Sequence, residues 1–282
     1  MPVLVERLVP DELWVLFRHV VPPTEVKRPQ GGGRRRAGDR ETLAAIVFAA
    51  TSGCTWRQLP PVFGPAWTTV YRRFAQWSRD RVWARLHRAV VLDELSAQGE
   101  LDWSRCAIDS VSVRAGKRGP LTGPNPTDRG KPGSKIHLIT DRNGLPLSLC
   151  ISGANMHDSL GLQPLVRGIP PIRSWRGPRR RRPAKLHADK GYDYDHLRRW
   201  LRKRGIRHRI ARKGIESSQR LGRHHWVVER TVSWLGGCRR LHRRYERKAE
   251  HVLGRGAVPA CSVLTTRTSS SRRPPQDRPS SA

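Results

Sequence analysis

The stretch Lys185–Tyr194 (KLHADKGYDY) decides how we interpret the rest of the chain. A short apolar run ends at Asp189, and a lysine and the turn-forming Gly191 follow directly. This order is typical of a buried strand that delivers a carboxylate to the edge of a sheet, where a metal ion or a substrate can reach it. Taken alone it is weak evidence, because many strands end in an aspartate that only caps a turn.

Two further carboxylates lie in stretches that complement this one. Asp109 falls within the strand-like run Arg105–Val113 (RCAIDSVSV), and Glu229 falls within the helical pattern His225–Leu235 (HWVVERTVSWL). The intervals of 80 and 40 residues between the three acids leave room for the intervening strands and helix.

Three carboxylates on a strand, a strand end and a helix suit phosphodiester chemistry with two divalent ions. Two ions ~4 Å apart can activate the nucleophile and hold the leaving oxygen, and magnesium needs only a few carboxylates because it keeps several waters. We predict that Asp109 bridges both ions, that Asp189 ligates one and that Glu229 ligates the other. Any one acid alone is more simply explained as a surface charge; the three together favour the metal site.

The composition points to a polyanionic partner. The 282 residues carry 55 Lys and Arg against 23 Asp and Glu, a formal net charge of +32. A field of this strength favours nucleic acid, although a generally Arg-rich composition accounts for part of the excess. Hydrophobic residues make up 37% of the chain, which predicts one real core with polar appendages.

The cysteines and the apolar runs exclude several protein classes. The five cysteines include no CxxC pair, which argues against a zinc ribbon or a disulfide framework and suits a reducing cytosol. No apolar run approaches the length of a membrane span, and Met1–Arg7 lacks the apolar core of a signal peptide. We therefore expect a soluble, cytoplasmic protein.

The first hundred residues read as a small helical region. Residues 1–27 contain one short helix, residues 28–40 form a basic Gly/Arg-rich linker, and residues 41–100 hold three longer helical patterns. The pattern Trp67–Trp77 has apolar residues on one side and Arg72 and Arg73 on the other. This arrangement resembles a helix-turn-helix, so we predict that Arg72 and Arg73 bind DNA, with a three-helix core that has no DNA-binding role as the alternative.

From Cys106 onward the sequence period changes to that of strands. Three strands that suit antiparallel hairpins come first, and strands and helices then alternate. This order predicts an α/β domain over residues 101–253, with an RNase H-like mixed sheet flanked by helices. Basic residues that lie near the acids in sequence or topology are candidate phosphate contacts, although several of them could be merely solubilising. They are Lys135, Lys190, Arg212, Lys213, Arg223 and Arg230.

Several linked motifs resemble a known family. They are "AIDSVSVRA", "KPGSKIHLITDRNGLPLSLCISGANMHDS", "LHADKGYDYDHLRRWLRKRGI", "RHRIARKGIESSQRLGRHHWVVERTVSWL" and "RRLHRRYERKAEH", with "TSGCTWRQLP" and "FGPAWTTVYRRFAQW" near the N-terminus. Together they resemble the DDE transposases of bacterial insertion sequences, family five, over about Leu43 to Leu253.

The resemblance implies that Asp109, Asp189 and Glu229 are the catalytic acids and that two Mg²⁺ or Mn²⁺ ions are the cofactors. The implied activity is cleavage of double-stranded DNA at inverted-repeat ends and joining of those ends to target DNA. A homodimer on DNA is expected, because two ends must be brought together.

Two departures from the family pattern leave alternatives open. His225 stands where the family usually has arginine, and after Leu253 the run Gly254–Pro259 breaks the helical period before a low-complexity tail. We therefore expect residues 254–282 to be disordered, and we interpret them as a frameshifted tail that lost the last helix. The alternatives are a catalytically inactive DNA-binding relic or repressor of the same family, and a stand-alone nuclease of the same fold.

Overall fold

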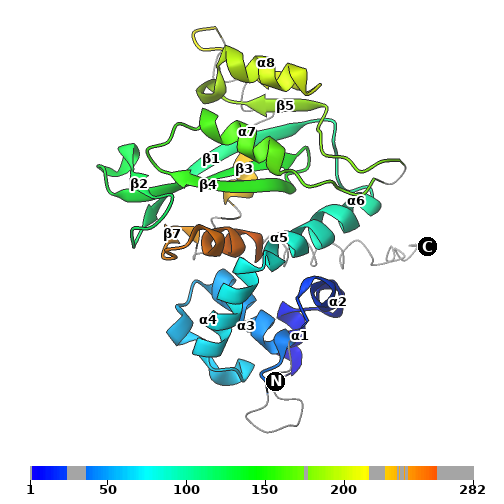
Figure 1. Cartoon of the computed structure of the whole chain (residues 1–282), viewed down its shortest axis with the longest axis vertical. Coiled ribbons are helices and arrows are strands. Elements are labelled where there is room, and N and C mark those ends of the chain that lie inside the picture. Colours follow the sequence, from blue (N-terminus) through cyan, green and yellow to red (C-terminus); the bar gives the residue numbers. More distant parts are fainter. Residues whose placement is uncertain are drawn as a thin grey trace, which may run out of the picture.

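A computed structural model describes residues 2–23, 36–174, 177–215, 226–233, 235, 238 and 241–258. Figure 1 shows a helical N-terminal region at one end of the molecule and a sheet with its flanking helices at the other. A helical connection, coloured cyan, joins the two parts.

The N-terminal region packs around aromatic side chains. Its helices are α1 (Pro2–Leu8), α2 (Asp11–Val20), α3 (Asp39–Ser52) and α4 (Trp67–Arg79), with short 3-10 turns η1 (Trp56–Gln58) and η2 (Pro61–Phe63). Gly53, at a φ of 78°, ends α3 in the left-handed conformation that glycine adopts readily. Phe17, Phe74 and Trp77 are almost fully buried, whereas Trp67 and Tyr71 are 39% and 40% exposed, so the apolar face predicted for Trp67–Trp77 is buried only in part. Because α3 begins at Asp39, the last two residues of the predicted linker are helical.

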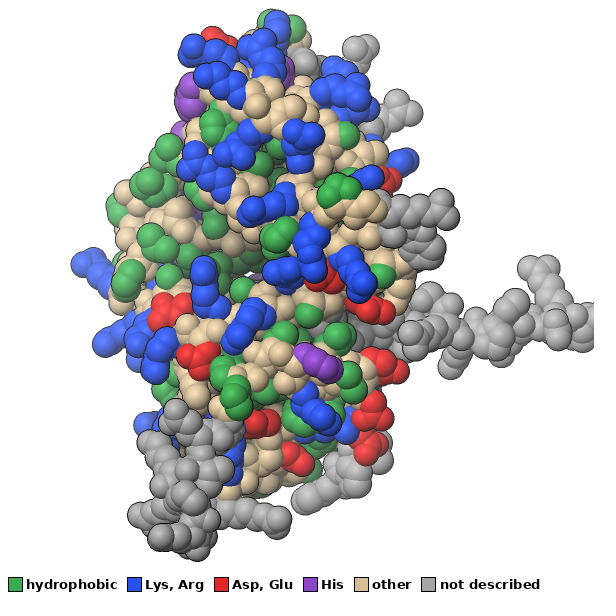
Figure 2. Space-filling model, turned by 45° about the vertical axis from the view of Figure 1, so that its right-hand side comes forward, with side chains coloured by type: hydrophobic (Ala, Val, Ile, Leu, Met, Phe, Trp, Pro, Cys, Tyr) green, Lys and Arg blue, Asp and Glu red, His purple; other side chains and the backbone are tan. Residues whose placement is uncertain are grey.

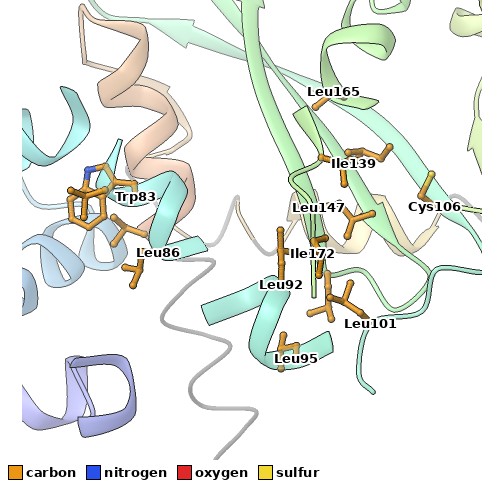
Figure 3. Packing of buried hydrophobic residues seen from close by; sticks show 14 of the residues in the cluster. Trp83, Leu86, Leu92, Leu95, Leu101, Cys106, Ile139, Leu147, Leu165 and Ile172 are labelled. Atoms are coloured by element: carbon orange, nitrogen blue, oxygen red, sulfur yellow. The ribbon is translucent and has the colours of Figure 1, made fainter. Parts of the chain in front are cut away.

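The connection is made of three consecutive segments: α5 (Val82–Leu86), the π-helical η3 (His87–Glu94) and α6 (Leu95–Ala97). Its buried side chains belong to one core that reaches from the helical region into the sheet. In Figure 3, Trp83 and Leu86 face the helical region, whereas Leu92 lies beside Ile172 next to the sheet. The two predicted regions therefore share one hydrophobic core.

The sheet has the predicted mixed order. Its strands are β1 (Cys106–Ala115), β2 (Gly123–Pro124), β3 (Pro132–Asp141), β4 (Pro146–Gly153), β5 (Lys185–Ala188), β6 (Arg207–Ile210) and β7 (Arg243–Arg244), accompanied by α7 (Ser159–Gly168), α8 (Asp195–Lys203), η4 (Pro126–Asp128) and η5 (Lys190–Tyr192). Strand β3 pairs antiparallel with β1 and β4, while β5 lies parallel between β1 and β6. The RNase H-like mixed sheet flanked by helices is confirmed.

The end of the described chain corrects one prediction. Residues 249–258 are helical, so the helix does not end at Leu253, and Arg255 is only 2% exposed. The glycines that seemed to break the helix allow close packing instead, since a Cβ at Gly254 would lie 2.7 Å from Cδ1 of Trp83. The predicted disorder is therefore wrong for residues 254–258, and residues 259–282 lie outside the described residues.

None of the helices in the described ranges is both long enough and apolar enough to cross a membrane.

Candidate active site

Strand pairing brings two of the three predicted acids to the same level of the sheet. Strands β1 and β5 run parallel, with Cys106 opposite Leu186 and Ala107 opposite His187. The same offset, continued by two residues, places Asp109 level with Asp189, directly after the end of β5. Side chains at matched positions of neighbouring strands project to the same face. We therefore infer that the two carboxylates lie on one face at the β1–β5 boundary.

Both carboxylates retain access to solvent, and each already accepts a backbone hydrogen bond. Oδ1 of half-buried Asp109 accepts from the Ser110 amide at 2.7 Å. Oδ1 of exposed Asp189 accepts from the Gly191 amide at 3.0 Å and so caps η5. Asp189 thus has the turn-capping role that its sequence also allowed, and its second oxygen is not needed for that cap.

The pKa of a buried tyrosine near these acids is affected by their negative charges. Tyr192 is 1% exposed, and its hydroxyl has no hydrogen-bond partner within the part of the chain that is described. Burial raises the pKa of Tyr192, and the charges of Asp158, Asp109 and Asp189 raise it further. A third carboxylate, Asp158, therefore acts on the same region as the two predicted ones.

Asp158 is held on the opposite side of the sheet by its own cation. It lies at the start of α7, accepts from the Ser110 hydroxyl at 2.7 Å, and pairs with Lys135 Nζ at 2.9 Å. Desolvation raises the pKa of Asp158, but the hydrogen bonds from Ser110 and Lys135 and the nearby positive charge lower it overall. Since Ser110 alternates with Asp109 along β1, the Lys135–Asp158 pair lies across the sheet from the predicted metal ligands.

Lys135 therefore binds groups of the protein itself, whereas the sequence predicted that it contacts a phosphate. Besides Asp158, its ammonium donates to the Met156 carbonyl oxygen at 2.8 Å. Ser110 and Tyr192 were missed as members of this region. The sequence offered one signal for Tyr192, which lies in the polar turn after β5, four residues beyond the end of that strand.

The helix that carries Glu229 covers the face onto which Asp109 projects. In the helical residues 226–233, Val228 is fully buried and belongs to a cluster with Ala107 and Leu138. Ala107 is two residues before Asp109, and Leu138 is the register partner of Asp109 on β3. All of these side chains therefore lie on one face of the sheet.

Glu229 itself is exposed. Its neighbour Arg230 donates to the carbonyl oxygen of Asn143 at 2.9 Å, in the turn between β3 and β4. In the residues that the structure describes, no group of three or more His, Cys, Asp or Glu side chains is close enough to hold a metal ion. The strand register thus indicates that Asp109 and Asp189 share one face of the sheet, and the contacts of Val228 indicate that the helix carrying Glu229 covers that same face.

The remaining predicted DNA contacts are spread over the molecule. Arg72 is exposed on α4, whereas Arg73 is half-buried and has a pKa lowered mainly by burial. Nζ of Lys213 lies over the Tyr194 ring at 4.9 Å from its centroid. Lys190 is half-buried within η5, Arg212 and Arg230 are exposed, and Arg223 lies outside the described residues.

Asp109 and Asp189 are the described residues best suited to hold a divalent ion. Two carboxylates on one face, with solvent access, can serve magnesium, because this ion prefers oxygen ligands and fills its remaining positions with water or substrate oxygens. The donor set fits magnesium or manganese better than a softer metal, since no cysteine or histidine joins it.

Comparison with known proteins places the chain among related sequences. Residues 103–261 match a family described as "Transposase DDE domain", and residues 9–87 match one described as "Putative transposase of IS4/5 family". A putative transposase for insertion sequence element IS402 from Burkholderia cepacia is 52% identical over 131 residues, which are 46% of this chain and 62% of that relative. An uncharacterized 16.2 kDa protein of IS402 from the same species is 37% identical over 120 residues, covering 42% of this chain and 81% of that protein.

A solved structure supports the fold independently of sequence. The piggyBac transposase in a synaptic complex with hairpin DNA superposes with a TM-score of 0.52, at 10% identity, over 98% of this chain and 77% of that one. At this identity the likeness concerns the fold alone.

Proposed function

The chain belongs to the DDE-domain transposases of the IS4/5 family, and from this membership we propose that it cuts double-stranded DNA at the inverted-repeat ends of an insertion sequence and joins them to target DNA. The observation that carries the proposal is the β1–β5 register, which sets Asp109 level with Asp189 inside the residues that match the DDE domain. The chain aligns with only 62% of the length of the IS402 relative, so the activity rests on this geometry together with the family.

In the proposed mechanism, Asp109, Asp189 and Glu229 would hold the divalent ions, with Asp109 as the ligand shared between them. Two Mg²⁺ or Mn²⁺ ions would supply the positive charge that activates the attacking hydroxyl and stabilises the leaving oxygen. Asp109 is suited to the central place because it lies within a strand that is paired on both sides. The backbone N–H groups of Ser110 and Gly191 donate hydrogen bonds to the carboxylates of Asp109 and Asp189 and hold them in position.

Because no three carboxylates are grouped to hold a metal ion within the described residues, we propose that the helix carrying Glu229 rearranges to complete this set. Its helix already lies on the correct face, through Val228 against Ala107 and Leu138, so a shift of this helix would change its contacts without crossing the sheet. We expect DNA binding to drive that shift, because a bound phosphate draws ions and carboxylates to one place.

The Lys135–Asp158 pair has a supporting role in this proposal. By neutralising Asp158 on the far face, Lys135 limits the negative charge that acts on the β1–β5 boundary. The reaction also implies a homodimer, because two DNA ends must be joined in one complex, and it places the protein in the cytoplasm with the DNA.

The test is strand cleavage of a duplex that carries the element's own end, with magnesium, by the wild type and by Asp109→Asn and Asp189→Asn. Asp195→Asn is the matched control, since it removes one exposed carboxylate in the first turn of α8. We expect cutting by the wild type and the control and none by the two site variants. Cutting that survives both site substitutions would refute the proposal.

Within the described residues no group of three carboxylates is placed to hold a metal ion, and this observation favours a second candidate, a DNA-binding relic or repressor without catalysis. Binding of the element's end without any cutting by the wild type would establish this alternative. Loss of cutting in Glu229→Gln, with end binding retained, would instead assign Glu229 to the active enzyme.

A further inference from the structure

The basic run Arg179–Arg182 has no part in the active site described above, and most of it is held by backbone carbonyl groups. Nε of Arg181 donates to the Ile169 carbonyl oxygen at 3.2 Å, and Nη1 of Arg182 donates to the Arg204 carbonyl oxygen at 3.0 Å. Arg179 differs, because it pairs with Asp93 at 3.4 Å. A carbonyl orients a guanidinium group but leaves its net charge uncompensated.

Arg181 and Arg182 line a pocket with arginines from two helix ends. Arg167 lies in the last turn of α7, and Arg204 directly follows α8. The pocket has a volume of about 510 Å³, and the aliphatic side chains of Val166 and Ile206 complete its wall. We call this site, lined by Arg167, Arg181, Arg182, Arg204, Val166 and Ile206, the arginine pocket.

Local geometry explains how so many cations gather there. Helix C-termini favour positive charge, which suits Arg167 and Arg204. Gly205, at a φ of +66°, lets the chain turn away from α8, and a Cβ at this position would lie 3.0 Å from Nη1 of Arg182. Within the described ranges, none of the four pocket arginines is assigned a carboxylate partner.

An aromatic ring keeps two of these arginines in place. The guanidinium carbon of Arg204 lies 4.3 Å from the centroid of Trp200, and that of Arg167 lies 5.7 Å from the same centroid. Such stacking orders the planar groups while their edges stay free to donate hydrogen bonds. Guanidinium edges that converge on one pocket match the oxygens of a phosphate group.

A basic surface continues from the arginine pocket toward Asp189. Between residues 193 and 213 there are nine Lys or Arg and only two Asp. Figure 2 shows basic side chains gathered at the top of the molecule, the end at which α8 lies in Figure 1. Burial lowers the pKa of His208, and the charges of Arg198 and Arg202 on α8, Arg209 on β6 and Arg212 after β6 lower it further, which indicates that these cations lie close together.

The spacing suits a duplex. Arg181 and Arg182 precede β5 and Arg204 follows α8, whereas Asp189 follows the end of β5 and precedes the start of α8 by six residues. Nine helical residues span ~13 Å, and successive base pairs rise by ~3.4 Å. DNA whose scissile phosphate reaches Asp189 would therefore pass the pocket about four base pairs further along.

We propose that the arginine pocket binds the phosphate backbone of duplex DNA, outside the catalytic acids and without reading sequence. The proposal rests on the proposed function only for the choice of DNA as the polyanion. Backbone contacts of this kind position a duplex and carry no base information, so the pocket would hold end DNA and target DNA alike.

The experiment measures the affinity of the full chain for a 30-base-pair duplex of arbitrary sequence, by fluorescence anisotropy between 50 and 200 mM salt. The test variant is Arg182→Gln/Arg204→Gln. The control is Arg7→Gln/Arg18→Gln, which removes the same charge from exposed positions on α1 and α2 at the other end of the molecule. A charge-retaining variant, Arg182→Lys/Arg204→Lys, guards against a folding defect.

Each phosphate contact contributes about −0.9 to the slope of log affinity against log salt, so the loss of two contacts should make the slope shallower by about 2. Over this salt range, the factor by which the affinity of the test variant falls should therefore be roughly tenfold smaller than the factor for the wild type. The control and the lysine variant should keep a slope close to that of the wild type.

An unchanged slope in the glutamine variant would overturn the proposal, and so would an equal change in the control. If the variant instead alters self-association in sedimentation but not the DNA slope, the pocket contacts another protein copy. Because this experiment measures binding and not cleavage, its result is independent of the proposed function. The pocket can prove to bind the DNA backbone in a chain that cuts no DNA, and it can prove not to do so in a chain that cuts.

Discussion

The buried side chain of Arg255 is expected to be a main support of the interface between the C-terminal helix and the N-terminal helices. Nε of Arg255 lies 3.1 Å from Oε1 of Glu246, and the two side chains are only 2% and 8% exposed. The guanidinium carbon also lies 4.2 Å from the centroid of Trp56 and 5.2 Å from that of Phe74. The substitution Arg255→Met keeps the length of the side chain and removes its charge.

The magnitude follows from what the substitution leaves behind. Removal of one partner of a buried ion pair costs about 3–5 kcal/mol, because the other charge stays buried without compensation. The lost cation–π contact adds up to about 2 kcal/mol, and the methionine side chain restores part of the packing. We expect a loss of about 4 kcal/mol in the free energy of unfolding, or a fall of ~10 °C in the melting temperature for a chain of this size.

The assay is urea and thermal unfolding followed by circular dichroism, with Arg79→Met on the exposed side of α4 as the matched control. The double variant Arg255→Met/Glu246→Gln should recover at least 1 kcal/mol relative to Arg255→Met, since it removes the uncompensated carboxylate. A loss under about 1 kcal/mol in Arg255→Met, or no recovery in the double variant, would refute the reasoning.

Three further outcomes are expected. Gly254→Ala should cost about 1–3 kcal/mol of stability through overpacking, because the new Cβ would lie 2.7 Å from Trp83. Gly256→Ala should cost much less, since the nearest neighbour of its Cβ would be 3.5 Å away. Equal unfolding midpoints for the two variants would contradict this reasoning. Burial lowers the pKa of His87 to about 4. Below pH 6.5 the unfolded chain therefore binds a proton that native His87 does not, and about 2 kcal/mol of stability should be lost between pH 7 and pH 5. In parallel unfolding titrations, His87→Gln should lack this pH-dependent loss of stability. Asp109→Asn should retain or increase duplex affinity while cleavage disappears, as a gel-shift assay can show, and lost affinity would point to a folding role for Asp109.

Local patterns in the sequence were sufficient for most of the longer elements and for their order, but they predicted one helix where α1 and α2 lie and did not predict β2 or β7. The apolar positions of Trp67–Trp77 predicted a buried helical stripe, and alternating and continuous apolar runs predicted the strands of the mixed sheet. The interval of 80 residues between Asp109 and Asp189 proved to equal the register offset of β1 and β5, although nothing in the sequence itself specified that pairing.

Tertiary contacts decided the features that depend on residues distant in the chain. Lys135 pairs with Asp158 because strand alternation sends it to the α7 side of the sheet, a side that a single strand's sequence does not specify. Likewise, the position of the helix that carries Glu229 depends on the buried contacts of Val228 with Ala107 and Leu138, which are distant in the sequence.

The C-terminal helix shows the same division most clearly. Taken by themselves, Gly254 and Gly256 signal the end of a helix, and Arg255 signals an exposed surface. In the folded chain, Trp83 occupies the space next to Gly254, and Glu246 and Trp56 surround Arg255. The sequence alone determined the periodic elements, because periodicity reflects local backbone geometry. Only the tertiary structure decided which glycine is a packing site and which cation is buried, because both depend on neighbours that folding brings in from distant parts of the chain.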